Sequence, residues 1–207
     1  MKLPVLIIPI LTLATFAFYG CQSVPHQANS NKGFDHDITK LEFSPATLPG
    51  GSRSESTWSE SGYIIHAPLH KTGQHIMGSE SASSWRTPLS RGDYIAVNGT
   101  DCLSFGRYSF QDGFLERKDG KSFTPKSVDL AEYSTVYPVP IEIRFYATTA
   151  NGAVTTYTFV TDGVIDGPGG KEDFQTFIFP ESFTDIKKLS WASNGCCMDN
   201  FVIESDK

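Results

Sequence analysis

The sequence lacks the surplus of basic side chains that nucleic-acid binding requires. It holds 17 lysine and arginine residues against 23 aspartate and glutamate residues, a formal net charge of −6, so it has no excess positive charge to neutralise a phosphate backbone. It also lacks a Gly-x-Ser-x-Gly motif, a P-loop and a dinucleotide-binding fingerprint. These absences predict a protein without a nucleic-acid partner, and they favour a non-catalytic role.

Charged residues of either sign are scarce, at 19% of the chain, whereas 39% of the residues are hydrophobic and 13% are aromatic. This composition excludes an intrinsically disordered protein. The 18 glycines and 12 prolines are scattered without a period, which excludes collagen and indicates many turns. The length of 207 residues suits one domain with appendages.

The chain begins with a positively charged residue and an uncharged apolar run over residues 3–20, which is typical of an export signal. The run ends at Phe18-Tyr19-Gly20-Cys21, which resembles the processing site of bacterial lipoproteins. The resemblance implies that residues 1–20 are removed and that Cys21 becomes the acylated, palmitate-bearing N-terminus. Several acyl chains hold a protein on a membrane, because each buried CH₂ contributes ~0.8 kcal/mol. The alternatives are a plain secretory signal and an uncleaved anchor.

Gln22, rather than an aspartate, follows the cysteine, which by the same resemblance implies sorting to the outer membrane. Residues 21–37 are polar and show no apolar period, so we expect a flexible tether there. We expect the folded domain to span residues 38–207.

From Ile38 onward the apolar residues recur at every second position, as in half-buried strands. The clearest case is the pair of runs 141–148 and 154–161 around Asn151-Gly152, which predicts a β-hairpin. No segment has the pattern of an amphipathic helix, so the chain is predicted to be all-β, an antiparallel β-sandwich or jelly roll. Further strands are expected at 40–43, 62–67, 94–97, 103–110, 127–130, 174–179, 188–192 and 200–204, and a loop at 78–84.

Several landmarks follow one another in an order found in exported bacterial proteins. They are Glu60-Ser61-Gly62-Tyr63, His75-Ile76, Val97-Asn98-Gly99, the segment 123–131, the hairpin 143–159, the segment 174–191 and the closing run 199–203. In this order they resemble the single β-sandwich domain of PEP-CTERM-type proteins, which is similar to carbohydrate-binding jelly rolls. The resemblance covers residues 38–204 and implies that fold together with a carbohydrate-binding-like role.

The same resemblance implies one Ca²⁺ between the first and last strands, held by carboxylate and carbonyl oxygens. Asp199 occupies the acidic position of the closing Asp-Asn pair, and the second acid of such proteins falls at Ser44. Glu42 is two residues away, on the same face of a strand, so Glu42 and Asp199 are the expected calcium ligands. The alternative is that Asp199 and Asn200 hydrogen-bond a turn at the entry to the last strand.

Three histidines, His66, His70 and His75, lie close together in the sequence. Imidazole is a common ligand of transition metals, but Pro68 and Gly73 interrupt the pairing, and no Cys-x-x-Cys or His-Glu-x-x-His motif accompanies it. A zinc site is therefore disfavoured. By the resemblance, His75 occupies a position that often holds histidine, which implies that it lines a ligand pocket; the alternative is a hydrogen-bonded strand residue.

Aromatic side chains matter because sugar rings stack on exposed aromatic faces. Trp58 and Trp85 lie in polar, serine-rich surroundings, and Glu60 and Arg86 near them carry groups that hydrogen-bond hydroxyls. We expect these four side chains to form a carbohydrate-binding platform, with burial as loop-pinning residues as the alternative. Trp191 follows the alternation of a strand and is expected in the core.

Three cysteines follow Cys21, namely Cys102, Cys196 and Cys197. Export favours oxidation, and an odd number allows at most one intramolecular disulfide among them. Either Cys102 pairs with Cys196 or Cys197, or the two neighbours pair with each other. The choice depends on the separation of the Cα atoms.

These observations favour a lipid-anchored, non-catalytic protein of the cell envelope that binds carbohydrate or other envelope material. The first alternative is a jelly-roll polysaccharide hydrolase or lyase, which would gather His75, Glu60 and an arginine or tyrosine in one deep groove. The second is a purely structural envelope protein. The expected location is the outer membrane, with secretion as the alternative.

Overall fold

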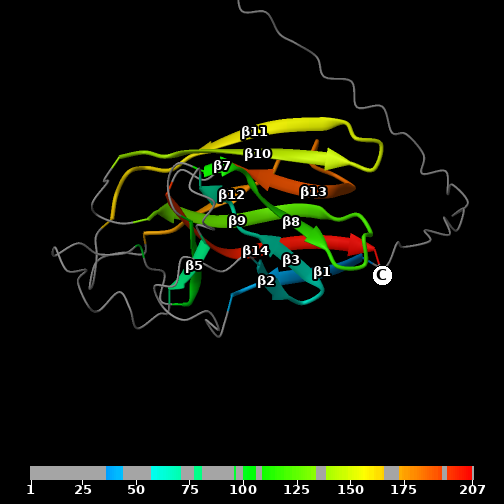
Figure 1. Cartoon of the computed structure of the whole chain (residues 1–207), viewed down its shortest axis with the longest axis horizontal. Coiled ribbons are helices and arrows are strands. Elements are labelled where there is room, and N and C mark those ends of the chain that lie inside the picture. The colour runs from blue at the N-terminus through cyan, green and yellow to red at the C-terminus, as the bar shows by residue number, and fades with distance from the viewer. Residues whose placement is uncertain are drawn as a thin grey trace, which may run out of the picture. The chain divides into compact units, whose positions relative to one another are not determined.

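The computed structural model describes residues 36–43, 57–70, 77–80, 96, 100–105, 109–133, 139–165, 173–192 and 195–206. These residues belong to one compact unit that runs from Phe34 to Lys207. All regular elements among them are strands, and all but two short ones form two antiparallel sheets packed together (Figure 1). The predicted all-β sandwich is therefore confirmed. No helix in the described part of the chain is long and apolar enough to span a bilayer.

The first sheet has six strands. They are β1 (His36–Leu41), β5 (Met77–Glu80), β6 (Cys102–Phe105), β9 (Thr124–Glu132), β12 (Gln175–Ile178) and β14 (Cys196–Asp206). The long strand β14 lies at the centre, and β9 pairs with it on one side. On the other side, β6 pairs with the beginning of β14 and β1 pairs with its end. β5 extends the sheet beyond β6, and β12 extends it beyond β9.

The second sheet also has six strands. They are β2 (Thr57–Glu60), β3 (Tyr63–His66), β8 (Gly113–Arg117), β10 (Glu142–Thr149), β11 (Val154–Val160) and β13 (Ile186–Trp191). Their order across the sheet is β11-β10-β13-β8-β3-β2. The short strands β4 (Leu69–His70) and β7 (Ser109–Gln111) pair separately.

The core lies between the two sheets, because each strand turns alternate side chains inward. In β10, Ile143, Phe145 and Ala147 are buried while Glu142 and Arg144 are exposed. The largest fully buried side chains include Trp191, Phe43, Phe105, Phe123, Phe145, Phe183 and Phe201. The predicted core position of Trp191 is confirmed.

The predicted hairpin is confirmed as β10 and β11, which pair up to Thr148 and Val154. Its loop is closed by hydrogen bonds from Gly152 N to Thr149 O (3.0 Å) and from Thr149 N to Ala153 O (3.0 Å). Gly152 has a φ of 83°, the left-handed conformation that follows a type I turn in a three-residue hairpin loop. Glycine at this position therefore sets the register of the whole hairpin.

Several strands differ from the sequence prediction. β2 and β8 form where the pattern predicts no strand, and β5 places Gly78–Glu80 in a sheet, within the predicted loop 78–84. These short strands alternate weakly and form because a neighbouring strand offers them a partner. β1 begins at His36, inside the predicted tether, and the expected strand 103–110 is divided between β6 and β7. The expected strand 94–97 lies outside the described residues except for Ala96, which is in no strand.

Candidate functional site

The outer face of the second sheet carries a row of side chains that crosses five strands. His66 on β3 pairs with Phe114 on β8, and Phe114 pairs with Ser190 on β13. Ser190 pairs with Tyr146 on β10, which in turn pairs with Thr156 on β11. In β3, β8, β13 and β10 the residues on either side of the row are buried, so the row faces away from the core. We call these five side chains the outer row.

Two stacked rings form one end of the outer row. The ring centroids of His66 and Phe114 are 4.1 Å apart, with an interplanar angle of 15°. His66 Nε2 lies 2.9 Å from Glu116 Oε1, which fixes the imidazole within the stack. The Lys188 Nζ atom lies 5.0 Å from the centroid of the Phe114 ring, within the range of a cation–π contact. The Glu116 carboxylate and the Lys188 ammonium group therefore flank the stacked rings of His66 and Phe114.

Asp112 precedes β8 and lies two residues before Phe114 in the chain. Burial raises the pKa of the Asp112 carboxyl group, and the positive charge of Lys188 partly offsets that rise. Glu116 lies four positions after Asp112 in the sequence, and its carboxylate is held 2.9 Å from His66 Nε2.

The outer row combines groups that carbohydrate recognition uses. Adjacent strands are about 4.8 Å apart, so five positions span about 19 Å. Beyond the stacked rings, the row presents the hydroxyl groups of Ser190, Tyr146 and Thr156. An apolar sugar face can lie on an aromatic ring while its hydroxyls bond to these neighbours.

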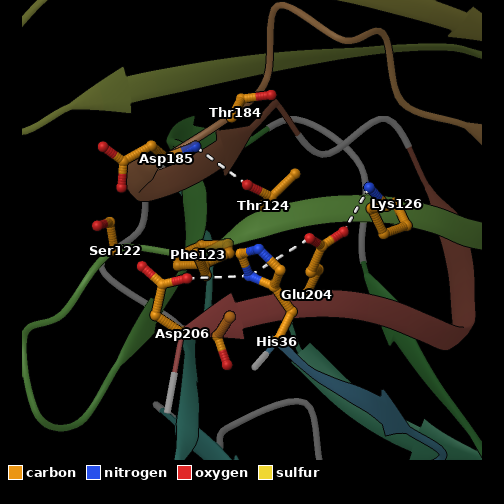
Figure 2. A pocket seen from close by; sticks show the side chains of 10 residues that line it. His36, Ser122, Phe123, Thr124, Lys126, Thr184, Asp185, Glu204 and Asp206 are labelled. Carbon is orange, nitrogen blue, oxygen red and sulfur yellow. Dashed lines mark hydrogen bonds and ion pairs between the residues drawn. The ribbon is translucent and has the colours of Figure 1, made fainter. Parts of the chain in front are cut away.

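A hollow of about 310 Å³ lies where β1 begins and β14 ends, beside the buried ring of Phe123 (Figure 2). Four of the titratable side chains that line it contact one another. His36 Nδ1 lies 2.9 Å from Asp206 Oδ1, and Lys126 Nζ lies 2.6 Å from Glu204 Oε2. The hydrogen bond from Lys126 lowers the pKa of Glu204. These contacts connect β14 to β1 and to β9, so the polar side chains of the hollow chiefly hold three strands together.

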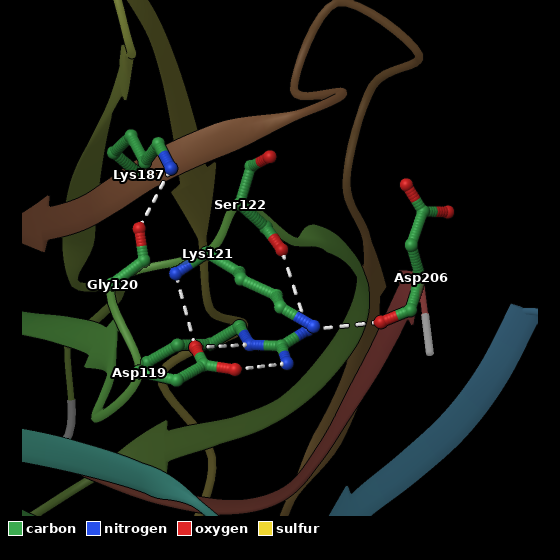
Figure 3. Close-up of polar contacts among 7 residues, drawn as sticks. Asp119, Gly120, Lys121, Ser122, Lys187 and Asp206 are labelled. Atoms are coloured by element: carbon green, nitrogen blue, oxygen red, sulfur yellow. Dashed lines mark hydrogen bonds and ion pairs between the residues drawn. The ribbon is translucent and has the colours of Figure 1, made fainter.

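Arg117, at the end of β8, organises a second polar cluster. Its Nε and Nη2 atoms donate to the two carboxylate oxygens of Asp119 at 2.9 and 2.7 Å. Its Nη1 atom donates to the carbonyl oxygens of Ser122 (3.5 Å) and Asp206 (3.4 Å) (Figure 3). Chiefly through the hydrogen bonds from Arg117, the pKa of Asp119 falls to about 2. A hollow of about 450 Å³, lined in part by Tyr63, adjoins this cluster.

The structure corrects the predicted platform at Trp58 and Glu60. Trp58 is only 6% exposed, and its ring packs edge-on against Phe43 with centroids 6.0 Å apart. The reason is its register, because Trp58 pairs with Ile65, a core position of β3. The Glu60 carboxylate accepts hydrogen bonds from the backbone N–H groups of Glu42 (3.1 Å) and Phe43 (2.9 Å). Trp58 therefore offers no exposed ring, and Glu60 bonds the backbone.

The two expected calcium ligands lie in different surroundings. Glu42 is exposed, and its Oε1 atom lies 3.1 Å from Lys40 Nζ. Asp199 is fully buried, and its oxygens accept from Thr100 Oγ1 (2.7 Å) and Asn200 N (2.7 Å). Among the described residues, no three His, Cys, Asp or Glu side chains group closely enough to hold a metal ion. The calcium site stays a prediction from the resemblance.

Asp199 and Asn200 lie inside β14 rather than in a turn at its entry. The register with β9 shifts between Asp199 and Val202, and Asn200 has a φ of 48°, which together describe a β-bulge. Asn200 Nδ2 donates to Asp129 Oδ2 at 2.7 Å and so ties the bulge to β9. The alternative of a turn at the entry to the strand is therefore wrong, because Asp199 and Asn200 form a bulge inside β14.

The three cysteines after Cys21 separate into two buried groups. Cys196 packs within the main core, whereas Cys102 and Cys197 form a separate cluster against Tyr133 and Phe174. Cys21, His75, Trp85 and Arg86 lie outside the described residues, as does the side chain of His70. The predictions for those residues stay predictions.

No protein-family model matches the chain, and no curated protein matches it significantly. The outer row is not found by sequence reasoning, because its members are far apart in the chain and meet only through strand register. A partial signal exists in the run Gly113–Arg117, where Phe114 and Glu116 take alternate positions. Its short length hides that signal.

Proposed function

We propose that the protein is a lipid-anchored, non-catalytic β-sandwich of the cell envelope that binds carbohydrate through the outer row. The observation that carries the proposal is the stack of His66 on Phe114, held by Glu116 on the outer face of the second sheet. Hydroxyl groups continue this surface across three further strands. An extended glycan is the ligand that fits such a polar and partly aromatic row.

The proposed localisation rests on the N-terminal sequence. The apolar run 3–20 and the motif that ends in Cys21 support export followed by acylation. Gln22 supports the outer membrane as the destination, by resemblance to lipoprotein sorting. The order of landmarks over residues 38–204, which resembles PEP-CTERM-type exported domains, supports export.

Binding is favoured over hydrolysis by the contact that the acid beside the stacked rings makes. The Glu116 carboxylate is hydrogen-bonded to His66, and the sequence carries no Gly-x-Ser-x-Gly or His-Glu-x-x-His hydrolase motif. A polysaccharide hydrolase or lyase thus finds less support here than a binding surface.

The test is a glycan array, followed by calorimetric titration, on the purified chain and two variants. Phe114→Ala removes one ring of the stack, and Tyr157→Ala removes a 44% exposed aromatic ring outside the outer row as a matched control. We expect Phe114→Ala to weaken binding by about tenfold or more, which corresponds to ~1.4 kcal/mol. Tyr157→Ala should bind like the parent. Uniform absence of glycan binding by the folded parent would overturn the proposal in favour of a structural envelope protein.

A further inference from the structure

We propose that Cys102 and Cys197 form the disulfide bond of this domain when an oxidised thiol–disulfide partner is present. The two side chains belong to one small buried cluster, apart from the main core. They are 3% and 0% exposed, respectively. The inference does not depend on the proposed carbohydrate-binding role.

Strand register places both thiols on the same face of the first sheet. Cys197 on β14 pairs with Ser104 on β6, and directly paired residues share a face. Cys102 is two residues from Ser104 on the same strand, so it also shares that face. Tyr133 and Phe174 pack against the two cysteines, and Cys197 Sγ lies 3.9 Å from the carbonyl oxygen of Tyr133. The thiols are thus diagonal neighbours in one buried cluster.

The other two pairings are disfavoured by the same geometry. Cys196 is the chain neighbour of Cys197 in β14, and neighbouring residues of a strand point to opposite faces. Cys196 accordingly packs in the main core among residues of both sheets. Burial, with smaller contributions from Cys102 and Glu132, raises the pKa of Cys196 to about 12. Its thiolate, the form that attacks a disulfide, is therefore scarce at neutral pH.

The diagonal placement predicts a bond that reduces readily. Cα atoms of diagonal neighbours are about 7 to 8 Å apart, slightly beyond the usual span of a disulfide. Closing the bond therefore needs a small shift of a strand. β6 spans only Cys102–Phe105, so it is the strand that we expect to move. A disulfide formed with such adjustment is more easily reduced than a relaxed one.

The oxidation balances with glutathione disulfide as the oxidant. One protein thiolate attacks a sulfur of glutathione disulfide, which forms a mixed disulfide and expels one glutathione thiolate. The second protein thiolate attacks the protein-side sulfur and expels the second glutathione. The protein loses two protons and two electrons, and one glutathione disulfide becomes two glutathione molecules. Because both thiols are buried, we expect the exchange during folding or local opening.

The test is to unfold the full chain under reduction and to refold it in a glutathione redox buffer. The product is digested without reduction and mapped by tandem mass spectrometry. Any peptide that holds Cys197 also holds Cys196, so Cys102→Ser, Cys197→Ser and the matched control Cys196→Ser assign the pair. We expect a peptide cross-linked to Cys102, with a mass 2 Da below the summed mass of the two reduced peptides, in the wild type. Among the three variants, we expect it only in Cys196→Ser.

A thermal melt supplies a second readout. Adding reductant should lower the melting temperature of the wild type and of Cys196→Ser by roughly 5 to 15 °C, and leave that of Cys197→Ser unchanged. The proposal is overturned if the wild type keeps all three thiols in an oxidising buffer. It is equally overturned if the mapped link joins Cys102 to Cys196, or Cys196 to Cys197. Where a variant fails to fold, fragment ions from cleavage between Cys196 and Cys197 in the wild-type peptide assign the link, so the test remains.

Discussion

Replacing Glu60 by alanine should destabilise the domain without touching its outer row. The Glu60 carboxylate holds the end of β1 against β2: Oε1 accepts from Glu42 N at 3.1 Å, and Oε2 accepts from Phe43 N at 2.9 Å. Phe43 has a φ of 54°, so the chain bends into a left-handed conformation at this point. Its ring is nevertheless fully buried against Trp58. The Glu60 carboxylate therefore stabilises the bend that places the Phe43 ring in the core.

The expected loss follows chiefly from the two hydrogen bonds to the backbone, to which Trp58 Nε1 adds a longer one, at 3.4 Å from Oε2. A hydrogen bond to a charged group contributes about 1.5 to 3 kcal/mol, and a buried donor that loses its partner costs a similar amount. Water can replace the carboxylate at the exposed N–H of Glu42, but less well at the partly buried N–H of Phe43. Glu60→Ala should therefore cost about 2 to 3 kcal/mol. Glu60→Gln keeps one acceptor oxygen and should cost about half as much.

Urea denaturation followed by tryptophan fluorescence measures the free energy of unfolding of each variant. In a thermal melt, the same loss should appear as roughly 5 to 10 °C in a domain of this size. Glu42→Ala is the matched control, because Glu42 is an exposed carboxylate paired with Lys40 at the surface and should matter by less than about 0.5 kcal/mol. If Glu60→Ala behaves like Glu42→Ala, the reasoning about the bend is refuted.

Three further outcomes are expected. Gly163→Ala should lower the free energy of unfolding, measured by urea denaturation, by about 2 kcal/mol or more, because Gly163 has a φ of 80° and its new Cβ would lie 2.6 Å from Pro140 Cδ; an unchanged free energy contradicts this. The pKa of Asp119 is lowered to about 2 by Arg117, so its stabilisation is present above pH 4 and is lost as the pH falls towards 2. Asp119→Asn should flatten that part of a plot of melting temperature against pH, and an identical plot would count against the pair. Cys21→Ser should release the protein from the membrane fraction, and normal fractionation of the variant would refute the acylation site.

The architecture is predictable from the sequence where a strand has alternating apolar and polar residues and is followed by a recognisable turn motif. β10 and β11 meet both conditions, since alternating residues flank Asn151-Gly152, and the observed pairing follows. β5 meets neither, because Met77–Glu80 holds a glycine and no apolar alternation. Such a strand forms when β6 offers it a partner, which is a property of the assembled sheet rather than of the segment.

The candidate site is less predictable, because burial depends on register between strands. The serine-rich surroundings of Trp58 indicate an exposed ring, yet its pairing with Ile65 turns that ring inward. Conversely, Phe114 becomes part of the outer row because it pairs with His66 and Ser190, which are distant in the sequence. A shift of one residue would reverse both results.

The acids of this domain can be divided by what their oxygens contact. Glu60 accepts from backbone N–H groups, Asp119 binds Arg117, and the fully buried Glu132 on β9 accepts from Thr161 Oγ1 and Gly163 N, which follow β11. Removing any of these three leaves donors of the fold without partners, so the effect should appear in stability. Glu116 differs because its carboxylate contacts an imidazole on the outer face and accepts no hydrogen bond from the backbone within the described part of the chain. Glu116→Gln should therefore change glycan affinity while the melting temperature stays close to that of the parent, and a large loss of stability instead would place Glu116 with the structural acids.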